Sequence, residues 1–394
     1  MEKIIILKYG ELSTKKDNIN FFLKTLKKNI DFELKDIEHD VKYDHGRMFI
    51  KSNNLDLIMN KLNYVFGIQE IMEGYIFQER DIDVILRDIL DLIKDKEFKT
   101  FKVVSKRSDK TYKLNSMEIN AYLGGQILKN VKGSKVDVHN PDLNIYLEIR
   151  NKENLIYFNG VKGLGGYPVN TLGKGLLMLS GGIDSPVSGY LAIKRGIKIE
   201  CLYFESPPHT SVDAKNKVMD LAKVLSLYNL DIVVHVINFT RIQESILKNA
   251  PKEYLITIMR RMMYRISEEI AKERKCDILI NGESIGQVAS QTLKSMKVIN
   301  EVVKIPVIRP VSCFDKLEII DLAKRIKTYD ISIRPYMDCC TIFVPEHPII
   351  NPNLTDTVNY EKNIPWEDLV KEAIINKETI RLTNKEENKF QDLL

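Results

Sequence analysis

Residues 176–186 read LLMLSGGIDSP, and this stretch decides how the second half of the chain folds. Its apolar run is too short for a buried helix and ends at a Ser-Gly-Gly turn. A helix is expected from Pro186 to about Arg195, because the missing N–H of a proline costs little in the first helical turn. The stretch therefore predicts a buried parallel strand, a tight loop and a helix N-terminus.

The loop has the residues of an anion-binding site. Gly181 and Gly182 let the backbone approach a ligand, and Ser180 and Ser185 add hydroxyl groups. The free N–H groups and the dipole of the following helix favour phosphate. Asp184 would repel a bare phosphate, so its presence predicts a magnesium ion between the carboxylate and the phosphates of a nucleotide.

Two familiar glycine loops are excluded, since the sequence has neither a GxxxxGK[ST] phosphate loop nor a GxGxxG dinucleotide fingerprint. The loop instead resembles the SGGxDS signature of the PP-loop ATP pyrophosphatases. This resemblance implies cleavage of ATP between the α and β phosphates and adenylation of an oxygen. A plain glycine turn between a strand and a helix is the alternative.

Length and composition bound the class of protein. A chain of 394 residues exceeds one ordinary core, so two or three domains are expected. The formal net charge of +5 is too small to demand a nucleic-acid partner by itself. Five cysteines without a secreted disulfide pattern, and the lack of a signal peptide or membrane span, predict a soluble cytoplasmic protein.

The first half of the chain alternates strands and helices. Residues 1–55 read as a small strand–helix–strand unit, and a strand over 68–77 and a helix over 82–93 follow. The most basic stretch is a strand over 100–110 that continues to residue 113. Its cations are suited to RNA phosphates, and they are Lys102, Lys106, Arg107, Lys110 and Lys113. An ordinary edge strand protected by lysines is the alternative.

This half resembles a THUMP domain, an RNA-binding module of tRNA-modifying enzymes. The resemblance rests on the basic strand, on a Gly-Gly pair in the next helix and on the stretch VDVHNPD at residues 136–142. The domains that it implies are a ferredoxin-like α+β unit at 1–55, THUMP at 56–162 and a glycine-rich linker at 163–174.

The second half predicts a doubly wound parallel sheet over residues 175–394, because apolar strands alternate with helices. The further strands are expected at 197–204, 232–239 and 278–280, and the helices at 213–226, 240–249 and 253–274. The tail over 361–394 is expected to form a capping helix. In such a sheet, ligands bind at the carboxyl ends of the strands.

Several motifs follow those strand ends. Tyr203 and Phe204 close the second strand, and NGESIGQVASQT at 281–292 follows the fourth. The long helix carries Arg260 in the motif MRRMM, whose adjacent arginines point about 100° apart, so only one of them can face the site. Lys316 begins a later helix and is placed to act as a cation on phosphate.

Cys339 and Cys340 form a vicinal pair in a polar turn. No CxxC or histidine spacing typical of zinc surrounds them. A nearby Arg334 or Lys316 would lower a thiol pKa and make a nucleophile. The other three cysteines are expected to be buried packing residues: Cys201, Cys276 and Cys313.

Taken in order along the chain, these motifs resemble the tRNA 4-thiouridine synthase family, the tRNA sulfurtransferases. The resemblance implies ATP-dependent formation of 4-thiouridine at position 8 of tRNA, with magnesium, and sulfur supply for the thiazole of thiamine. It implies catalytic roles for Asp184, Lys316 and Cys340, with Cys339 as a second candidate. The positions that match ATP contacts are Met178, Leu179, Ser180, Gly181, Gly182, Asp184, Ser185, Tyr203, Phe204, Arg260, Gly282 and Gln291.

The implied reaction adenylates uridine O4 with loss of pyrophosphate, after which a persulfide sulfur attacks C4 and AMP leaves. Long family members carry a C-terminal rhodanese domain, whereas no cysteine follows residue 340 here. The persulfide is therefore expected on Cys340 or Cys339, or sulfur arrives as free sulfide, with a cysteine desulfurase as donor. The resemblance also implies a homodimer. The rival functions are a PP-loop enzyme that adenylates a small metabolite and a tRNA-binding protein with an inactive ATPase site.

Overall fold

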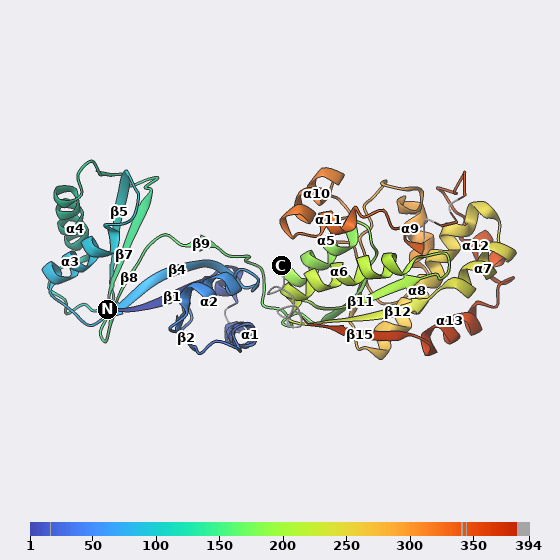
Figure 1. Ribbon diagram of the computed structural model, residues 1–394, viewed down its shortest axis with the longest axis horizontal. Helices are drawn as coiled ribbons and strands as arrows, with labels where there is room; N and C mark the ends of the chain where they lie inside the picture. Colours follow the sequence, from blue (N-terminus) through green and yellow to red (C-terminus); the bar gives the residue numbers. More distant parts are fainter. Residues whose placement is uncertain (16, 340–341, 344, 384–394) are drawn as a thin grey trace, which may run out of the picture. The chain divides into compact units, whose positions relative to one another are not determined.

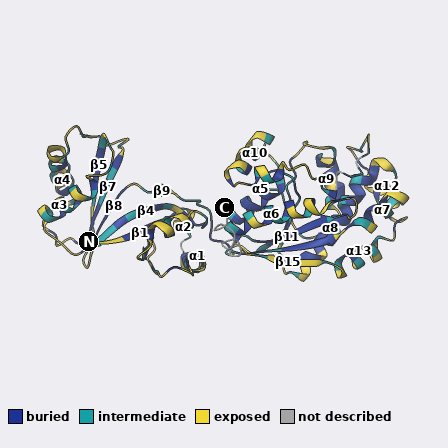
Figure 2. Ribbon diagram, in the orientation of Figure 1, coloured by how far each residue is buried: buried dark blue, intermediate teal, exposed yellow. Residues whose placement is uncertain are grey.

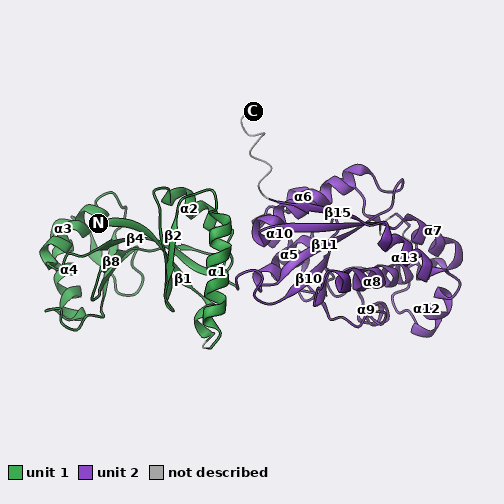
Figure 3. Ribbon diagram, turned by 90° about the horizontal axis from the view of Figure 1, so that it is seen from below, with its two compact units in different colours: residues 1–166 green, residues 167–394 purple. Residues whose placement is uncertain are grey.

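The chain forms two compact units, residues 1–166 and residues 167–394 (Figure 3). The computed structural model describes all residues except 16, 340, 341, 344 and 384–394. Each unit has its own sheet and its own apolar core, and each carries one of the two regions that the sequence singles out.

Unit 1 is built on a nine-stranded sheet in the order β2-β3-β1-β4-β8-β7-β5-β6, with β9 paired to β4. Its strands are β1 (Glu2–Tyr9), β2 (Asp40–Tyr43), β3 (Arg47–Lys51), β4 (Ile68–Phe77), β5 (Thr100–Arg107), β6 (Lys135–Val136), β7 (Leu143–Ile149), β8 (Asn154–Tyr157) and β9 (Val161–Lys162). Its α-helices are α1 (Ile19–Glu33), α2 (Leu55–Leu62), α3 (Ile82–Ile93) and α4 (Ser116–Asn130).

The periodicity of α3 explains how unit 1 builds its core. Ile85, Ile89 and Ile93 recur every fourth residue and are buried, so one face of this helix packs on the sheet. Phe101 and Val103 of β5 belong to the same apolar cluster. The alternate side chains of β5 therefore point away from this core.

The basic strand is shorter than expected, because β5 ends at Arg107 rather than continuing to residue 113. Asp109 turns the chain there: its Oδ1 accepts the N–H and the hydroxyl of Thr111 at 2.9 and 2.6 Å. The N–H groups of Ser108 and Asp109 both donate to the carbonyl of Ile149. These contacts take the place of strand pairing.

Unit 2 contains a six-stranded sheet in the order β14-β13-β10-β11-β12-β15. Its strands β11, β12 and β15 are labelled in Figure 1. Its strands are β10 (Lys174–Met178), β11 (Lys198–Glu205), β12 (Ile232–Asn238), β13 (Ile278–Ile280), β14 (Val307–Ile308) and β15 (Glu378–Leu382). All pairings are parallel except that of β15 with β12. The predicted doubly wound parallel sheet is confirmed.

Helices cover both faces of this sheet, and its strands are largely buried (Figure 2). On one face α5 and α6 contact the strands and are joined by α10 and α11, while α8 contacts the other face with α7, α9, α12 and α13 around it. The helices are α5 (Asp184–Lys194), α6 (Val212–Asn229), α7 (Thr240–Asn249), α8 (Leu255–Glu273), α9 (Leu293–Asn300), α10 (Lys316–Arg325), α11 (Tyr329–Ser332), α12 (Leu354–Glu361) and α13 (Trp366–Ile375).

The chain order reverses at β10, since β11 and β12 lie on one side of it and β13 and β14 on the other. The carboxyl end of β10 is thus the topological switch point, where open α/β sheets bind ligands. One expectation is wrong in the tail. The chain forms α13 and then the edge strand β15, rather than a helix alone, because β12 offers an unpaired edge and Arg381 of β15 forms an ion pair with Asp231.

Candidate active site

The loop that joins β10 to α5 opens on a pocket at the switch point. Ser180 N–H donates to Ser185 Oγ at 3.0 Å, which closes the loop on itself. Among the described residues no side chain caps the N-terminus of α5, so its first amides stay available to an anion. The pocket contains about 870 Å³ of empty space, including the open solvent at its mouth.

Gly282 is required by the close approach of two backbones. A Cβ at this position would lie 2.6 Å from the Ser185 nitrogen and 2.7 Å from the Asp184 carbonyl carbon. The loop after β13 therefore presses directly against the start of α5. Any side chain at residue 282 would push the two strand ends apart and reshape the pocket.

Asp184 and Lys316 meet, as the implied catalytic roles require. Lys316 Nζ lies 2.5 Å from Asp184 Oδ1, and Gln287 Nε2 donates to Asp184 Oδ2 at 2.9 Å. Lys316 is the first residue of α10, whose N-cap Asp315 accepts two backbone N–H groups and fixes the start of the helix. A carboxylate with an adjacent cation thus stands at the mouth of the phosphate loop.

Glu283 is the buried anchor of the pocket wall. It accepts hydrogen bonds from Arg260, from Arg309 Nε at 2.6 Å and from Asn281 Nδ2 at 2.9 Å, and Tyr264 Oη lies 3.2 Å away. Burial acts to raise the pKa of Glu283, but the guanidinium groups of Arg260 and Arg309 outweigh it and hold that pKa below its usual value. Glu283 stays ionised and positions Arg260 toward the pocket.

Two buried oxygen atoms of the pocket have no hydrogen-bond partner in the described part of the chain. They are the hydroxyl of Tyr203 and Oε1 of Gln291. Burial raises the pKa of Tyr203, so this hydroxyl remains a donor. A buried donor and a buried acceptor without partners are costly, which indicates that a ligand completes them.

The pocket gathers nearly every residue that matches an ATP contact. All of the predicted positions line it except Gly181, which lies in the same loop. Residues that sequence reasoning missed also line it: Met263, Asn281, Glu283 and Asp338. Met263 lies in the MRRMM motif and the next two in the NGES stretch, whereas Asp338 only precedes the cysteine pair.

Only one of the adjacent arginines faces the pocket, as helix geometry predicts. Arg260 lines it, while Arg261 is buried elsewhere and forms an ion pair with Glu361 at 2.8 Å. Arg261 is therefore not part of a solvated face of α8. Arg265 binds the same carboxylate at 2.7 Å, so the motif also fastens α8 to α12.

The cysteines are only partly as expected. Cys339 is buried and lines the pocket, and Gln243 donates to its carbonyl at 2.9 Å. Cys340 lies outside the described residues. Cys201 and Cys276 are buried, whereas Cys313 is exposed because it lies in the loop before α10 rather than in the core.

The cations expected to activate a thiol have other partners. Arg334 forms an ion pair with Asp220, and Lys316 forms one with Asp184. The geometry therefore does not assign either side chain to Cys339. Thiol activation at residue 340 stays a prediction from sequence.

The predicted RNA-contacting residues lie in unit 1. Lys102 Nζ donates to the Val138 carbonyl at 2.9 Å, and Arg107 Nη1 donates to the Tyr112 carbonyl at 3.1 Å. Lys106 is exposed and lines a shallow pocket with Arg47 and Arg150. The remaining two cations, Lys110 and Lys113, are exposed beyond the end of β5.

The fold and the loop define a PP-loop type of α/β enzyme joined to an RNA-binding module, and family comparisons agree. Residues 170–365 match the family described as thiamine biosynthesis protein (ThiI), residues 79–159 match the THUMP domain, and residues 4–72 match the ThiI ferredoxin-like domain. The chain belongs to the ThiI family of tRNA sulfurtransferases.

Similar proteins cover almost the whole chain. A probable tRNA sulfurtransferase of Thermoanaerobacter sp. (strain X514) is 45% identical over 372 residues, which span 94% of this chain and 97% of that protein. One from Streptococcus pneumoniae (strain CGSP14) is 44% identical over 375 residues, spanning 94% of this chain and 93% of that protein.

Solved structures match as well. The crystal structure of a 4-thiouridine synthetase–RNA complex with bound ATP has a TM-score of 0.89 and 38% sequence identity, and covers 97% of this chain and 100% of that chain. PH1313 from Pyrococcus horikoshii Ot3, at 24% identity and a TM-score of 0.64, covers 82% of this chain and 99% of its own and shares the fold. No helix among the described residues is long and apolar enough to cross a membrane.

Proposed function

We propose that the enzyme transfers sulfur to tRNA uridine and forms 4-thiouridine at position 8 by adenylating O4. The observation that carries this proposal is the SGGIDS loop with an uncapped helix N-terminus and the Asp184–Lys316 pair beside it. The relative solved with RNA and bound ATP supports the choice of both substrates.

The pocket suits ATP in its parts. The amides at the start of α5 take phosphate oxygens, and Arg260 and Lys316 neutralise their charge. Oε1 of Gln291 accepts a hydrogen bond from the adenine amino group. Uridine O4 then attacks the α-phosphorus and pyrophosphate leaves, which converts O4 into a group that can depart with AMP.

Magnesium fits the donor set at Asp184. The described residues contain no group of three or more His, Cys, Asp or Glu side chains able to hold a metal ion. A single carboxylate suffices for magnesium when phosphates supply further oxygens. The ion would neutralise phosphate charge when bound. Lys316, beside Asp184, supplies a further positive charge to the phosphates.

The sulfur step is assigned to the cysteine pair. A cysteine desulfurase loads a persulfide on Cys340, whose terminal sulfur attacks C4 while AMP leaves. A second thiol then breaks the remaining S–S bond, and Cys339, which lines the pocket, is the candidate within the chain. We further propose that the enzyme is a homodimer and that it acts on tRNA in the cytoplasm.

The family description supports a second use of the sulfur, in thiamine thiazole synthesis.

Single turnover with labelled ATP, magnesium, unmodified tRNA, a desulfurase and cysteine tests the reaction. Wild-type protein should release AMP only with tRNA and form 4-thiouridine. The Cys340→Ser variant should retain pyrophosphate release but lose both AMP release and the thiouridine, because AMP leaves only when the persulfide attacks C4. Cys313→Ser, at an exposed thiol, should keep all three. AMP formation without tRNA, or thiouridine formation by Cys340→Ser, would contradict the proposal. Growth of a deletion strain without thiamine tests the second use.

The basic strand is assigned to the tRNA backbone. Lys106 points away from the core of unit 1, because Phe101 and Val103 of the same strand are buried in it. We expect Lys106→Ala to weaken tRNA binding and to lower the slope of log affinity against log salt by about 1. Lys94→Ala, in an exposed residue at the end of α3, is the matched control and should change neither.

A further inference from the structure

The segment that precedes the cysteine pair is tied directly to the phosphate loop. The Gly181 N–H donates to Asp338 Oδ1 at 3.0 Å, and Ser332 Oγ donates to the Gly182 carbonyl at 3.2 Å. Asp338 immediately precedes Cys339 in the chain. An acidic side chain thus accepts a hydrogen bond from an amide of the loop. In the proposed function, this loop binds phosphate.

Lys217 of α6 stands at the same glycine. Its Nζ donates to the carbonyls of Arg334 and Tyr336 at 3.0 and 3.2 Å, so it holds the backbone of the segment. A Cβ on Gly181 would lie 2.9 Å from Lys217 Cε and 3.0 Å from Asp338 Oδ1. A buried cation, Lys217, and a half-buried carboxylate, Asp338, therefore pack together against one residue of the loop.

These charges make the loop sensitive to a second anion. Burial raises the pKa of Asp338, although the Gly181 N–H and Lys217 act in the other direction. A phosphate group that takes the Gly181 N–H would place its charge beside the carboxylate, where little water screens the repulsion. Lys217 attracts either anion. Only one of the two can keep the amide.

We propose that Asp338 is a positioning residue that holds the phosphate loop until ATP phosphates displace it, so that nucleotide binding moves the segment 332–339, which carries Cys339. This inference rests on the proposed binding of ATP at the loop. Once phosphate has replaced Asp338 at the Gly181 amide, Lys217 is the cation that faces the phosphate. Segment 332–339 therefore moves only after the nucleotide has bound.

The test measures binding and backbone mobility of the full chain, without turnover. The dissociation constant of an ATP analogue that cannot be cleaved between the α and β phosphates is determined by calorimetry, with magnesium. We expect Asp338→Asn, which keeps the shape but removes the charge, to bind the analogue about fivefold more tightly than wild type. Asp338→Ala should bind the analogue at least as tightly as Asp338→Asn does. Asp330→Asn, at an exposed acid in α11, should match wild type.

Amide hydrogen exchange of residues 332–339 supplies the second readout. In wild type the analogue should speed exchange of this segment, and in Asp338→Ala exchange should already be fast without it. Thermal melting checks that each variant is folded. Equal or weaker binding by both Asp338 variants, or exchange of the segment that ignores the analogue, overturns the inference. If the analogue fails to bind wild type at all, the proposed function fails with it.

Discussion

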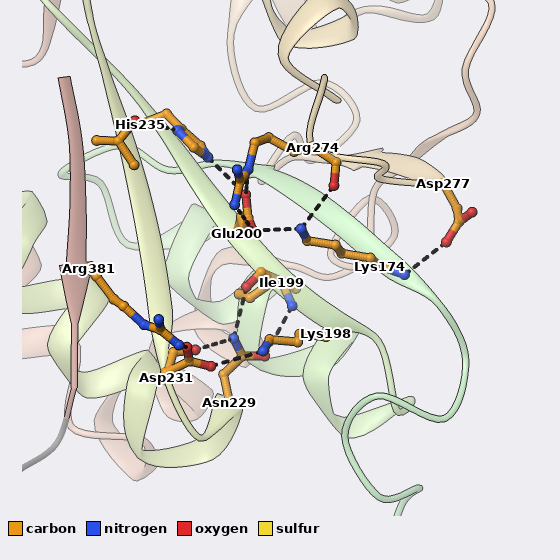
Figure 4. A network of polar contacts seen from close by, with 11 residues as sticks. Lys174, Lys198, Ile199, Glu200, Asn229, Asp231, His235, Arg274, Asp277 and Arg381 are labelled. Atoms are coloured by element: carbon orange, nitrogen blue, oxygen red, sulfur yellow. Dashed lines mark hydrogen bonds and ion pairs between the residues drawn. The ribbon is translucent and has the colours of Figure 1, made fainter. Parts of the chain in front are cut away.

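The two ends of the sheet in unit 2 both bury charged side chains, yet they differ in what those charges face. At the carboxyl ends, Asp184 and Glu283 stand around a pocket that contains unpartnered polar atoms. Toward the amino ends, Glu200 and Asp231 are enclosed by their own partners (Figure 4). Buried charge alone therefore does not mark a functional site, whereas buried charge beside unsatisfied atoms of a cavity does.

The amino-end network is a fully paired structure. Glu200 binds Arg274 Nε at 2.8 Å, Lys174 Nζ at 2.6 Å and His235 Nε2 at 2.8 Å (Figure 4). Burial acts to raise the pKa of Glu200, but these three partners outweigh it and hold that pKa well below its usual value. The network joins the starts of β10 and β11 to the end of α8, so it fixes the strands whose far ends form the pocket.

The largest expected effect is on catalysis, from a substitution at the carboxyl ends of the strands. Asp184→Asn should lower AMP formation about 10²–10³-fold, because a charge that acts in the transition state is lost. Its free energy of unfolding should stay within about 0.5 kcal/mol of wild type. Asp321→Asn, at an exposed acid of α10, is the control and should leave both unchanged. Full activity in Asp184→Asn would remove this residue from the mechanism.

The next largest effect is on stability, from a substitution at the amino ends of the strands. Glu200→Gln leaves Arg274, Lys174 and His235 without their shared carboxylate and should destabilise the protein by about 3 kcal/mol in urea denaturation. AMP formation per folded molecule should stay at the wild-type level. The control Glu269→Gln removes an exposed pair with Lys272 and should cost less than about 0.5 kcal/mol. An active-site defect in Glu200→Gln would erase the contrast between the two ends.

Acid should weaken both ends. The pKa values of Glu200, Glu283 and Glu361 all lie below the ordinary value of 4.5. Each carboxylate therefore stabilises the folded state fully above pH 4.5, and this contribution is lost as the pH falls through the lower, folded-state value. Urea denaturation from pH 7 to pH 3 should show the decline. A decline that is equally steep in Glu200→Gln would contradict this assignment.

The smallest effect sharpens the comparison at a single atom. Tyr203→Phe removes a buried hydroxyl that has no partner among the described residues, so stability should stay equal or rise by up to about 1 kcal/mol. If the ligand completes that hydroxyl, the dissociation constant for the ATP analogue should rise about fivefold. Unchanged affinity together with lower stability would show that Tyr203 serves packing only.

Local patterns predicted the parts of the structure that local forces determine. The bounds of β4, α3 and β13 agree with the sequence patterns, because the apolar period of each element is set by its own residues. Helix α5 begins at Asp184, two residues before the expected Pro186, since proline is tolerated anywhere in the first turn. The prediction that Cys313 is buried is wrong, because its exposure depends on the loop before α10 and not on its own neighbours in the sequence.

Contacts between distant residues were beyond such patterns. The bond from Gly181 to Asp338 spans 157 positions, and the Lys316–Asp184 pair spans 132. The edge strand β15 forms because β12 offers it an edge, which no feature of the tail itself reveals. Resemblance placed Lys316 in the site, but the roles of Asp338, Lys217 and Gln287 required the folded geometry.

The most direct test measures AMP formation and unfolding free energy on the same preparations of Asp184→Asn and Glu200→Gln, with unmodified tRNA and ATP in single turnover. We expect Asp184→Asn to lose AMP formation and keep its stability, and Glu200→Gln to lose stability and keep AMP formation per folded molecule. If both variants lose activity and stability together, the two ends of the sheet do not have separate roles, and the account is contradicted.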